Sequence, residues 1–79
     1  MTPEKQLEIA QALQSRGALG PCPVCHHPSR VVQPEYSGLL FSKTSTFEVP
    51  GPVLTCAIVE CQNCGFITSH NLPKLGVKA

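Results

Sequence analysis

Apolar residues recur at three- and four-residue steps over the first seventeen positions, which is the pattern of an amphipathic helix. The apolar positions are Leu7, Ile9, Ala10 and Leu13, and glutamine and glutamate side chains fill the other face. Thr2 suits an N-cap, Pro3 suits the first helical position, and Gly17 suits a left-handed stop. We therefore predict a helix within residues 1–17 that covers a small core, with a partner-binding helix as the alternative.

Short apolar segments separated by proline, glycine and polar residues predict strands in the rest of the chain. The candidate strands are residues 30–32, 39–41, 47–49, 53–60 and 66–70. Pro34 is expected to end the first strand, residues 36–38 to form a turn, and residues 42–46 to form a polar hairpin loop. The last two candidates are expected to pair as a hairpin, and the tail, residues 71–79, to pack loosely.

Four of the five cysteines stand in two Cys-x-x-Cys pairs, Cys22 with Cys25 and Cys61 with Cys64. This spacing lets a tight turn aim both sulfurs at one ion, and two such turns supply the four soft ligands of a closed structural zinc site. The 35 residues between the pairs do not oppose this interpretation. Loop closure costs only about 0.6 kcal/mol more per doubling of length, whereas structural zinc contributes about 10–16 kcal/mol. We predict one structural Zn²⁺ held by these four cysteines.

His26 follows the first pair, at a position where glycine is usual because the backbone of such turns often has a positive φ. With Cys22 it also completes a Cys-x-x-Cys-His pattern, which is typical of covalent haem attachment. Haem attachment belongs to exported proteins and would leave Cys61 and Cys64 without a role. Since four thiolates complete the metal shell, we expect His26 and His27 to be exposed loop residues.

Two further residues could carry chemistry. Cys56 lies within the strand predicted at residues 53–60, and no basic residue beside it in the sequence would activate its thiol. We expect it to be a small buried hydrophobic residue, with a redox thiol as the alternative. His70 is expected to be a surface or hydrogen-bonded residue and not a metal ligand.

The composition indicates one small folded domain. A chain of 79 residues with 42% hydrophobic and 14% charged residues buries only about 60% of its unfolded surface, so an additional staple is expected. We predict a single domain over residues 1–79, with the helix at 1–17, the metal-binding region at 20–70 and the tail at 71–79. The first twenty residues do not resemble a signal peptide, so we expect a cytoplasmic protein in which paired cysteines bind metal.

The motifs Cys22-Pro23-Val24-Cys25 and Cys61-Gln62-Asn63-Cys64-Gly65 resemble those of the zinc-ribbon family. The wider arrangement is similar to small bacterial stand-alone zinc-ribbon proteins of unassigned function, with a short helix, a CPxC turn and an apolar middle. The resemblance implies a small metal-stabilised α+β fold, with an N-terminal helix and an antiparallel zinc-ribbon sheet. It implies the ligands Cys22, Cys25, Cys61 and Cys64, and a zinc-stabilised binding module.

The charge distribution bears on the partner. The formal net charge of +1 falls to about −1 when four thiolates bind one divalent cation. The basic residues are Lys5, Arg16, Arg30, Lys43, Lys74 and Lys78, which do not cluster along the chain. Since phosphate-backbone binding usually needs a strongly basic surface, a nucleic-acid-binding, transcription-associated zinc ribbon is the alternative and not the first prediction.

An enzyme is the least favoured class. Glu35, Glu48 and Glu60 are isolated, and a metal saturated by four sulfurs offers no open position for catalysis. Iron in the same cage would make an electron carrier resembling rubredoxin, but such proteins are usually acidic and rich in aromatic residues. We expect a non-catalytic protein-interaction module that binds a protein partner or its own copy, with no membrane and no small-molecule substrate involved.

Overall fold

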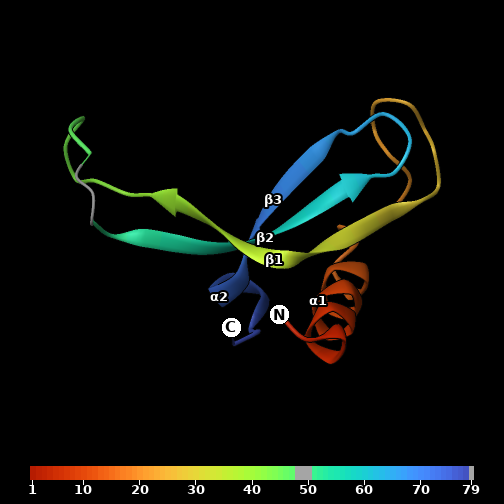
Figure 1. The fold of residues 1–79 in the computed structure, drawn as a ribbon, viewed down its shortest axis with the longest axis horizontal. Helices are drawn as coiled ribbons and strands as arrows, with labels where there is room; N and C mark the ends of the chain where they lie inside the picture. Colours follow the sequence, from red (N-terminus) through yellow and green to blue (C-terminus); the bar gives the residue numbers. More distant parts are fainter. Residues whose placement is uncertain (48–50, 79) are drawn as a thin grey trace.

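Three antiparallel strands in the order β1-β2-β3 form one sheet in the computed structural model, which describes residues 1–47 and 51–78 (Figure 1). The elements in chain order are α1 (Pro3–Ser15), β1 (Arg30–Leu40), β2 (Val53–Cys61), β3 (Ile67–Asn71) and α2 (Leu72–Leu75). Both helices lie on the same side of the sheet (Figure 1). The predicted class, an N-terminal helix plus a small antiparallel sheet, is confirmed.

Helix α1 begins and ends at the predicted signals. The Thr2 side chain accepts a hydrogen bond from the Lys5 backbone N–H at 3.1 Å, and the chain leaves the helix through Gly17 at φ 72°. Ile9 and Leu13, four residues apart, are buried, but Leu7 is 58% exposed, so its predicted place in the core is wrong. Leu7 and Ile9 are about 200° apart around the helix, and one contact face therefore cannot include both.

The core lies between the helices and one face of the sheet. Its buried members are Ile9, Leu13, Val32, Ala57, Val59, Leu72 and Val77. Val32 lies opposite Val59 in the β1–β2 pair, and Thr68 lies opposite Val59 in the β2–β3 pair, so these side chains share one face. The Gln6 side chain of α1 donates to the Val32 carbonyl at 2.9 Å. Helix α1 is thus attached to β1 by a polar contact as well as by apolar packing.

Pro34 does not end the first strand. β1 continues to Leu40, and its register with β2 shifts between Val32 and Tyr36. β1 is an edge strand, where an irregularity accommodates a proline that cannot donate a ladder hydrogen bond. The turn predicted at residues 36–38 is also wrong. Gly38 lies in the strand opposite Thr55, and a Cβ at this position would meet Cγ1 of Val53 at 2.5 Å.

The β1–β2 connection differs in part from the prediction. Residues 42–46 form the expected polar loop, in which the Ser42 hydroxyl accepts from the Thr44 backbone N–H at 3.1 Å. The strand predicted at residues 47–49 is not the partner of β1, because Leu40 pairs with Val53. Residues 48 and 49 of that prediction lie outside the described residues.

The predicted hairpin of β2 and β3 is confirmed, with Glu60 opposite Ile67 and Cys56 opposite Asn71. The tail, in contrast, does not pack loosely. Asn71 caps α2 by accepting from the Lys74 backbone N–H at 2.9 Å, and Leu72 and Val77 are 1% and 7% exposed. The C-terminal segment therefore completes the core beside β2.

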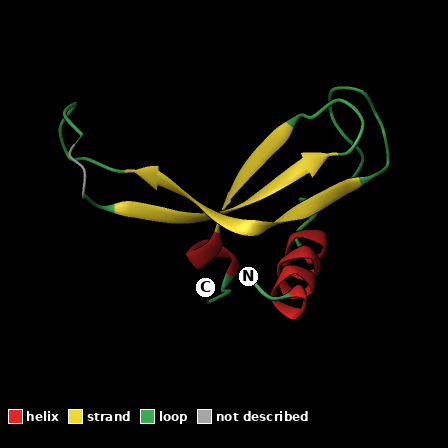
Figure 2. Ribbon diagram, viewed as in Figure 1, coloured by secondary structure: helices red, strands yellow, loops and turns green. Residues whose placement is uncertain are grey.

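Beyond the end of β3, β1 and β2 continue as a two-stranded projection, which we call the β-arm (residues 37–47 and 51–55; green in Figure 1). The loop before β1 and the loop between β2 and β3 meet at the opposite end of the sheet (Figure 2). The two cysteine pairs lie in these two loops. The sheet thus carries a cysteine cluster at one end and the β-arm at the other.

Candidate metal centre

The structure brings together the sulfurs of the two cysteine pairs, which are far apart in the sequence. The Sγ atoms of Cys22, Cys25, Cys61 and Cys64 all lie within 4.8 Å of one another. The Sγ atoms of Cys22 and Cys64 are 3.6 Å apart, as are those of Cys25 and Cys61. This arrangement is suited to binding one metal ion, as the sequence predicts.

The two turns have the same backbone hydrogen bonds. In the first, the Cys22 N–H donates to the His27 carbonyl and the His26 N–H donates to the Cys22 carbonyl, each at 2.9 Å. In the second, the Cys61 N–H donates to the Phe66 carbonyl at 2.9 Å and the Gly65 N–H donates to the Cys61 carbonyl at 3.1 Å. The two turns are therefore equivalent supports that aim their sulfurs at a common point.

His26 and Gly65 occupy the same place in the two turns. Their φ angles are 66° and 80°, and His26 is the one non-glycine residue with positive φ among the described residues. The sequence predicts this geometry from the usual glycine position. Histidine adopts it at an energetic cost, which shows that the first turn is determined by its surroundings and not by local preference.

Hydrogen-bond donors lie beside three of the four sulfurs. The backbone N–H of Val24 donates to Sγ of Cys22, and the backbone N–H of Asn63 donates to Sγ of Cys61, each at 3.4 Å. Nδ2 of Asn63 also lies 3.4 Å from Sγ of Cys25, across the cluster. Such donors stabilise negative charge on sulfur, which a thiolate ligand requires.

The pKa values of the first pair are lowered. The Asn63 side chain, followed by the backbone N–H of His27, lowers the pKa of Cys25 from 9.0 to about 6. Burial acts to raise the pKa of Cys22, but hydrogen bonds from the backbone of Cys25 and Val24 outweigh it and lower that pKa. The Cys25 thiol is therefore readily deprotonated near neutral pH, and the lowered pKa of Cys22 favours its thiolate in the same direction.

The pKa of Cys64 moves in the opposite direction. The backbone N–H of Phe66 favours its thiolate, but burial and the neighbouring cysteine sulfurs raise the pKa to about 12. Negative charge that collects on some sulfurs thus opposes ionisation of the last one. A divalent cation at the centre would remove this conflict, because it replaces the thiol protons and compensates the thiolate charge.

The donor set fits a tetrahedral metal better than a disulfide. A tetrahedron with metal–sulfur bonds of about 2.3 Å has sulfur–sulfur edges of about 3.8 Å. The distances of 3.6 Å are close to that edge and far above the disulfide bond length of about 2.05 Å. All five cysteines are free thiols. Four sulfurs, hydrogen-bond donors to several of them and a suitable spacing therefore match a structural metal site.

The remaining candidate residues lie outside this cluster. Among the described residues, the group that could hold a metal contains the four cysteines and no histidine. His26 is exposed as predicted, whereas His27 is half-buried and its Nδ1 accepts from the Ser29 backbone N–H at 3.1 Å. Cys56 is 1% exposed and its Sγ donates to the Leu54 carbonyl at 3.5 Å. The expected burial of Cys56 is confirmed.

His70 belongs to a separate polar contact. Its Nε2 lies 2.8 Å from Oγ1 of Thr68, which accepts from Nη2 of Arg30 at 2.9 Å. Burial and then the positive charge of Arg30 lower the pKa of His70. The prediction of a hydrogen-bonded residue is confirmed.

Asn63 is the site residue whose role the sequence does not predict. Its position in the second turn suggests tolerance of unusual φ, but its φ is not positive. Its side chain instead reaches the sulfur of the other pair, Cys25. The position of Asn63 between two cysteines is the one sequence signal for a role at the site. The sequence does not show that its side chain reaches a sulfur 38 residues away, because that contact depends on the fold.

No protein-family model matches the chain, and no curated protein and no solved structure matches it either. The resemblance to zinc ribbons therefore depends on the cysteine motifs and on the sulfur cluster. Within the described residues, neither helix has the length and hydrophobicity that crossing a membrane requires.

Proposed function

We propose that the chain is a non-catalytic structural-zinc domain that acts as a protein-interaction module in a reducing, cytoplasmic environment. The observation that carries this proposal is the convergence of four sulfurs within 4.8 Å from two matching turns. Cys22, Cys25, Cys61 and Cys64 would hold the ion. When bound, zinc supplies a fixed link between the two turns and compensates the thiolate charge.

The small core supports a structural role for the metal. Among the described residues the buried hydrophobic cluster has seven members, and the largest are Ile9, Leu13 and Leu72. A core of this size leaves a short chain marginally stable, and a structural metal is a common additional link. Four sulfurs saturate a tetrahedral zinc, so no position is left for a substrate. These features favour stabilisation and binding over catalysis.

The exposed surface supports an interaction role. Eleven large hydrophobic side chains are exposed among the described residues. Apolar surface that gathers in patches marks sites where another macromolecule binds. A net charge near neutrality offers little attraction for a phosphate backbone, and this favours a protein partner.

The matched pair Cys61→Ala and Cys56→Ala tests the metal role. Both cysteines are 1% exposed, so each substitution removes one buried sulfur atom. We expect Cys61→Ala to abolish stoichiometric zinc binding and the folded circular dichroism spectrum. Cys56→Ala should keep one zinc per chain and lose only about 1 kcal/mol of stability. Zinc content by plasma mass spectrometry and thermal unfolding provide the two readouts.

Equal zinc content and equal stability of the two variants would contradict the metal role. An absorption spectrum of the purified protein distinguishes zinc from iron, since zinc thiolate sites are colourless and iron thiolate sites are not. Strong salt-dependent binding to mixed DNA and RNA fragments would replace the protein-interaction role by the nucleic-acid alternative.

A further inference from the structure

The β-arm exposes a concentration of large apolar side chains. Each of the following exposes more than a third of its surface: Tyr36 at the root of the β-arm, and Leu39, Leu40, Phe41, Phe47 and Val53 within it. Lys43 is the one charged side chain among the described residues of the β-arm. A projection of this composition is unusual in contact with water, because isolated surface hydrophobic residues are common but clusters are not.

Both faces of the β-arm are apolar. Leu40 lies opposite Val53, and Leu39 lies opposite Leu54, so each face carries a cross-strand apolar pair. β3 ends opposite Cys56, and the ribbon beyond that point has two strands. A two-stranded ribbon is marginally stable by itself, and strands that are apolar on both faces are normally covered on both faces.

The whole chain exposes more surface than its mass predicts. A monomer of 8.5 kDa is expected to expose about 4,650 Å², whereas the chain exposes 5380 Å². The radius of gyration is 13.7 Å, compared with about 11.6 Å for a compact domain of this length. The excess of about 700 Å² is close to the roughly 800 Å² that each partner buries in a standard interface.

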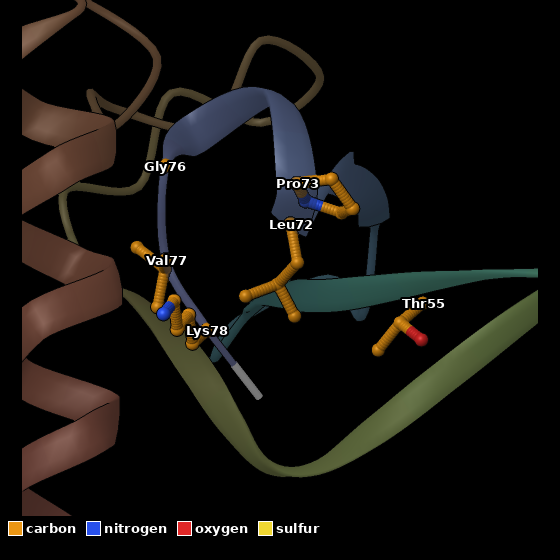
Figure 3. Close-up of a pocket in the computed structure, with 6 residues that line it drawn as sticks. All are labelled: Thr55, Leu72, Pro73, Gly76, Val77 and Lys78. Carbon is orange, nitrogen blue, oxygen red and sulfur yellow. The ribbon is translucent and has the colours of Figure 1, made fainter.

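An apolar pocket lies at the root of the β-arm. Its volume is about 440 Å³, and it is lined by Thr55, Leu72, Pro73, Gly76, Val77 and Lys78 (Figure 3). Thr55 lies two residues from Val53 on β2, so the two side chains point to the same face of the ribbon. The pocket and the face formed by Leu40 and Val53 are therefore continuous. One chain thus carries both an apolar projection and an apolar hollow.

We propose that the occupant of this surface is a second copy of the chain. Two β-arms packed antiparallel about a twofold axis would bring the tip of each, with Phe41 and Phe47, to the root pocket of the other. Such an arrangement buries projection and hollow in both copies at once, which is the self-complementarity of a twofold interface. This inference rests on the proposed interaction role and names the partner for it.

Sedimentation equilibrium of the zinc-loaded protein tests the inference with Val53→Lys and the control Leu7→Lys. The two residues are 54% and 58% exposed, and Leu7 lies on α1, away from the β-arm. We expect the wild type and Leu7→Lys to be dimers at micromolar concentration. Val53→Lys should raise the dissociation constant by about a hundredfold, since a charge buried at the centre of an interface has an effect as large as that of a hot-spot residue.

Crosslinking identifies the contact in the otherwise wild-type chain. A photoreactive phenylalanine at position 41, in a mixture of ¹⁴N- and ¹⁵N-labelled protein, should link one copy to residues 72–78 of the other. A zinc-loaded wild type that is monomeric at micromolar concentration would overturn the inference. So would a dimer that Val53→Lys leaves intact and that shows no link to those residues. In both cases zinc-dependent folding would still support the proposed structural-metal role, so the two failures are distinguishable.

Discussion

Gly65→Ala tests the matching geometry of the two cysteine turns. Gly65 has φ +80°, and a Cβ at this position would meet no atom within 4 Å. The substitution therefore creates no collision, and its cost is the left-handed backbone conformation alone, about 1–2 kcal/mol. For a domain of this length, that loss corresponds to a decrease in Tm of about 5–15 °C.

The assay is thermal unfolding of the zinc-loaded protein at a fixed excess of zinc, followed by circular dichroism. Gly20→Ala is the matched control, because Gly20 is also exposed with no atom near its Cβ position but has no positive φ. We expect its Tm to stay the same or to rise by a few degrees, as the alanine restricts the unfolded chain. His26→Gly, at φ 66° in the equivalent place, should not lower the Tm.

Equal Tm values for Gly65→Ala and Gly20→Ala would contradict this prediction. That result would mean that the second turn does not hold residue 65 in the left-handed region. A decrease for both variants would point to a requirement for glycine that is unrelated to φ. A Cβ at Gly20 or Gly65 would meet no atom within 4 Å. A difference in Tm between the two variants therefore reports backbone conformation and not packing.

Three further predictions concern the site and the core. Asn63→Ala should accelerate zinc transfer to a chromogenic chelator by about 10–100-fold, because it removes the donor to Cys25; Gln62→Ala serves as the control, and equal rates would contradict the assigned role. Acid should release zinc. Without metal, the pKa of Cys25 is lowered from 9.0 to about 6, so the preference of the fold for its thiolate is present above pH 9 and is lost as the pH falls through 6. Zinc needs this thiolate and should be retained at about pH 8 and released at about pH 4, and equal retention at both would contradict this prediction. Leu13→Ala should lower the free energy of unfolding by about 2–5 kcal/mol and Leu7→Ala by less than about 0.5 kcal/mol, and similar values in urea unfolding would contradict the assigned helix face.

The elements with strong local signals could be predicted from the sequence. Thr2, Pro3 and Gly17 mark the ends of α1, and the pattern of residues 53–60 marks β2. The spacing of the cysteines predicts which side chains meet, since few other arrangements satisfy four thiols at once. These signals lie in neighbouring residues or in the cysteine spacing, and both can be seen in the sequence.

The features that could not be predicted depend on tertiary context. A proline would end a strand in the centre of a sheet, but Pro34 lies in β1 at the edge of the sheet, where a register shift accommodates it. Gly38 resembles a turn residue, but it lies in β1 opposite Thr55, where the Val53 side chain occupies the space of a Cβ. Ile9 is buried and Leu7 exposed because of the position of the sheet beneath α1. The pattern of residues along the chain does not show which strand is at the edge or which side of α1 faces the sheet.

We propose that a single divalent ion holds the two cysteine turns together and thereby keeps the chain folded. Native mass spectrometry with circular dichroism, before and after removal of metal by a chelator under reducing conditions, tests it most directly. We expect one zinc per chain in the compact form and an unfolded, extended polypeptide once zinc is removed. A compact, metal-free chain with an unchanged spectrum would contradict it.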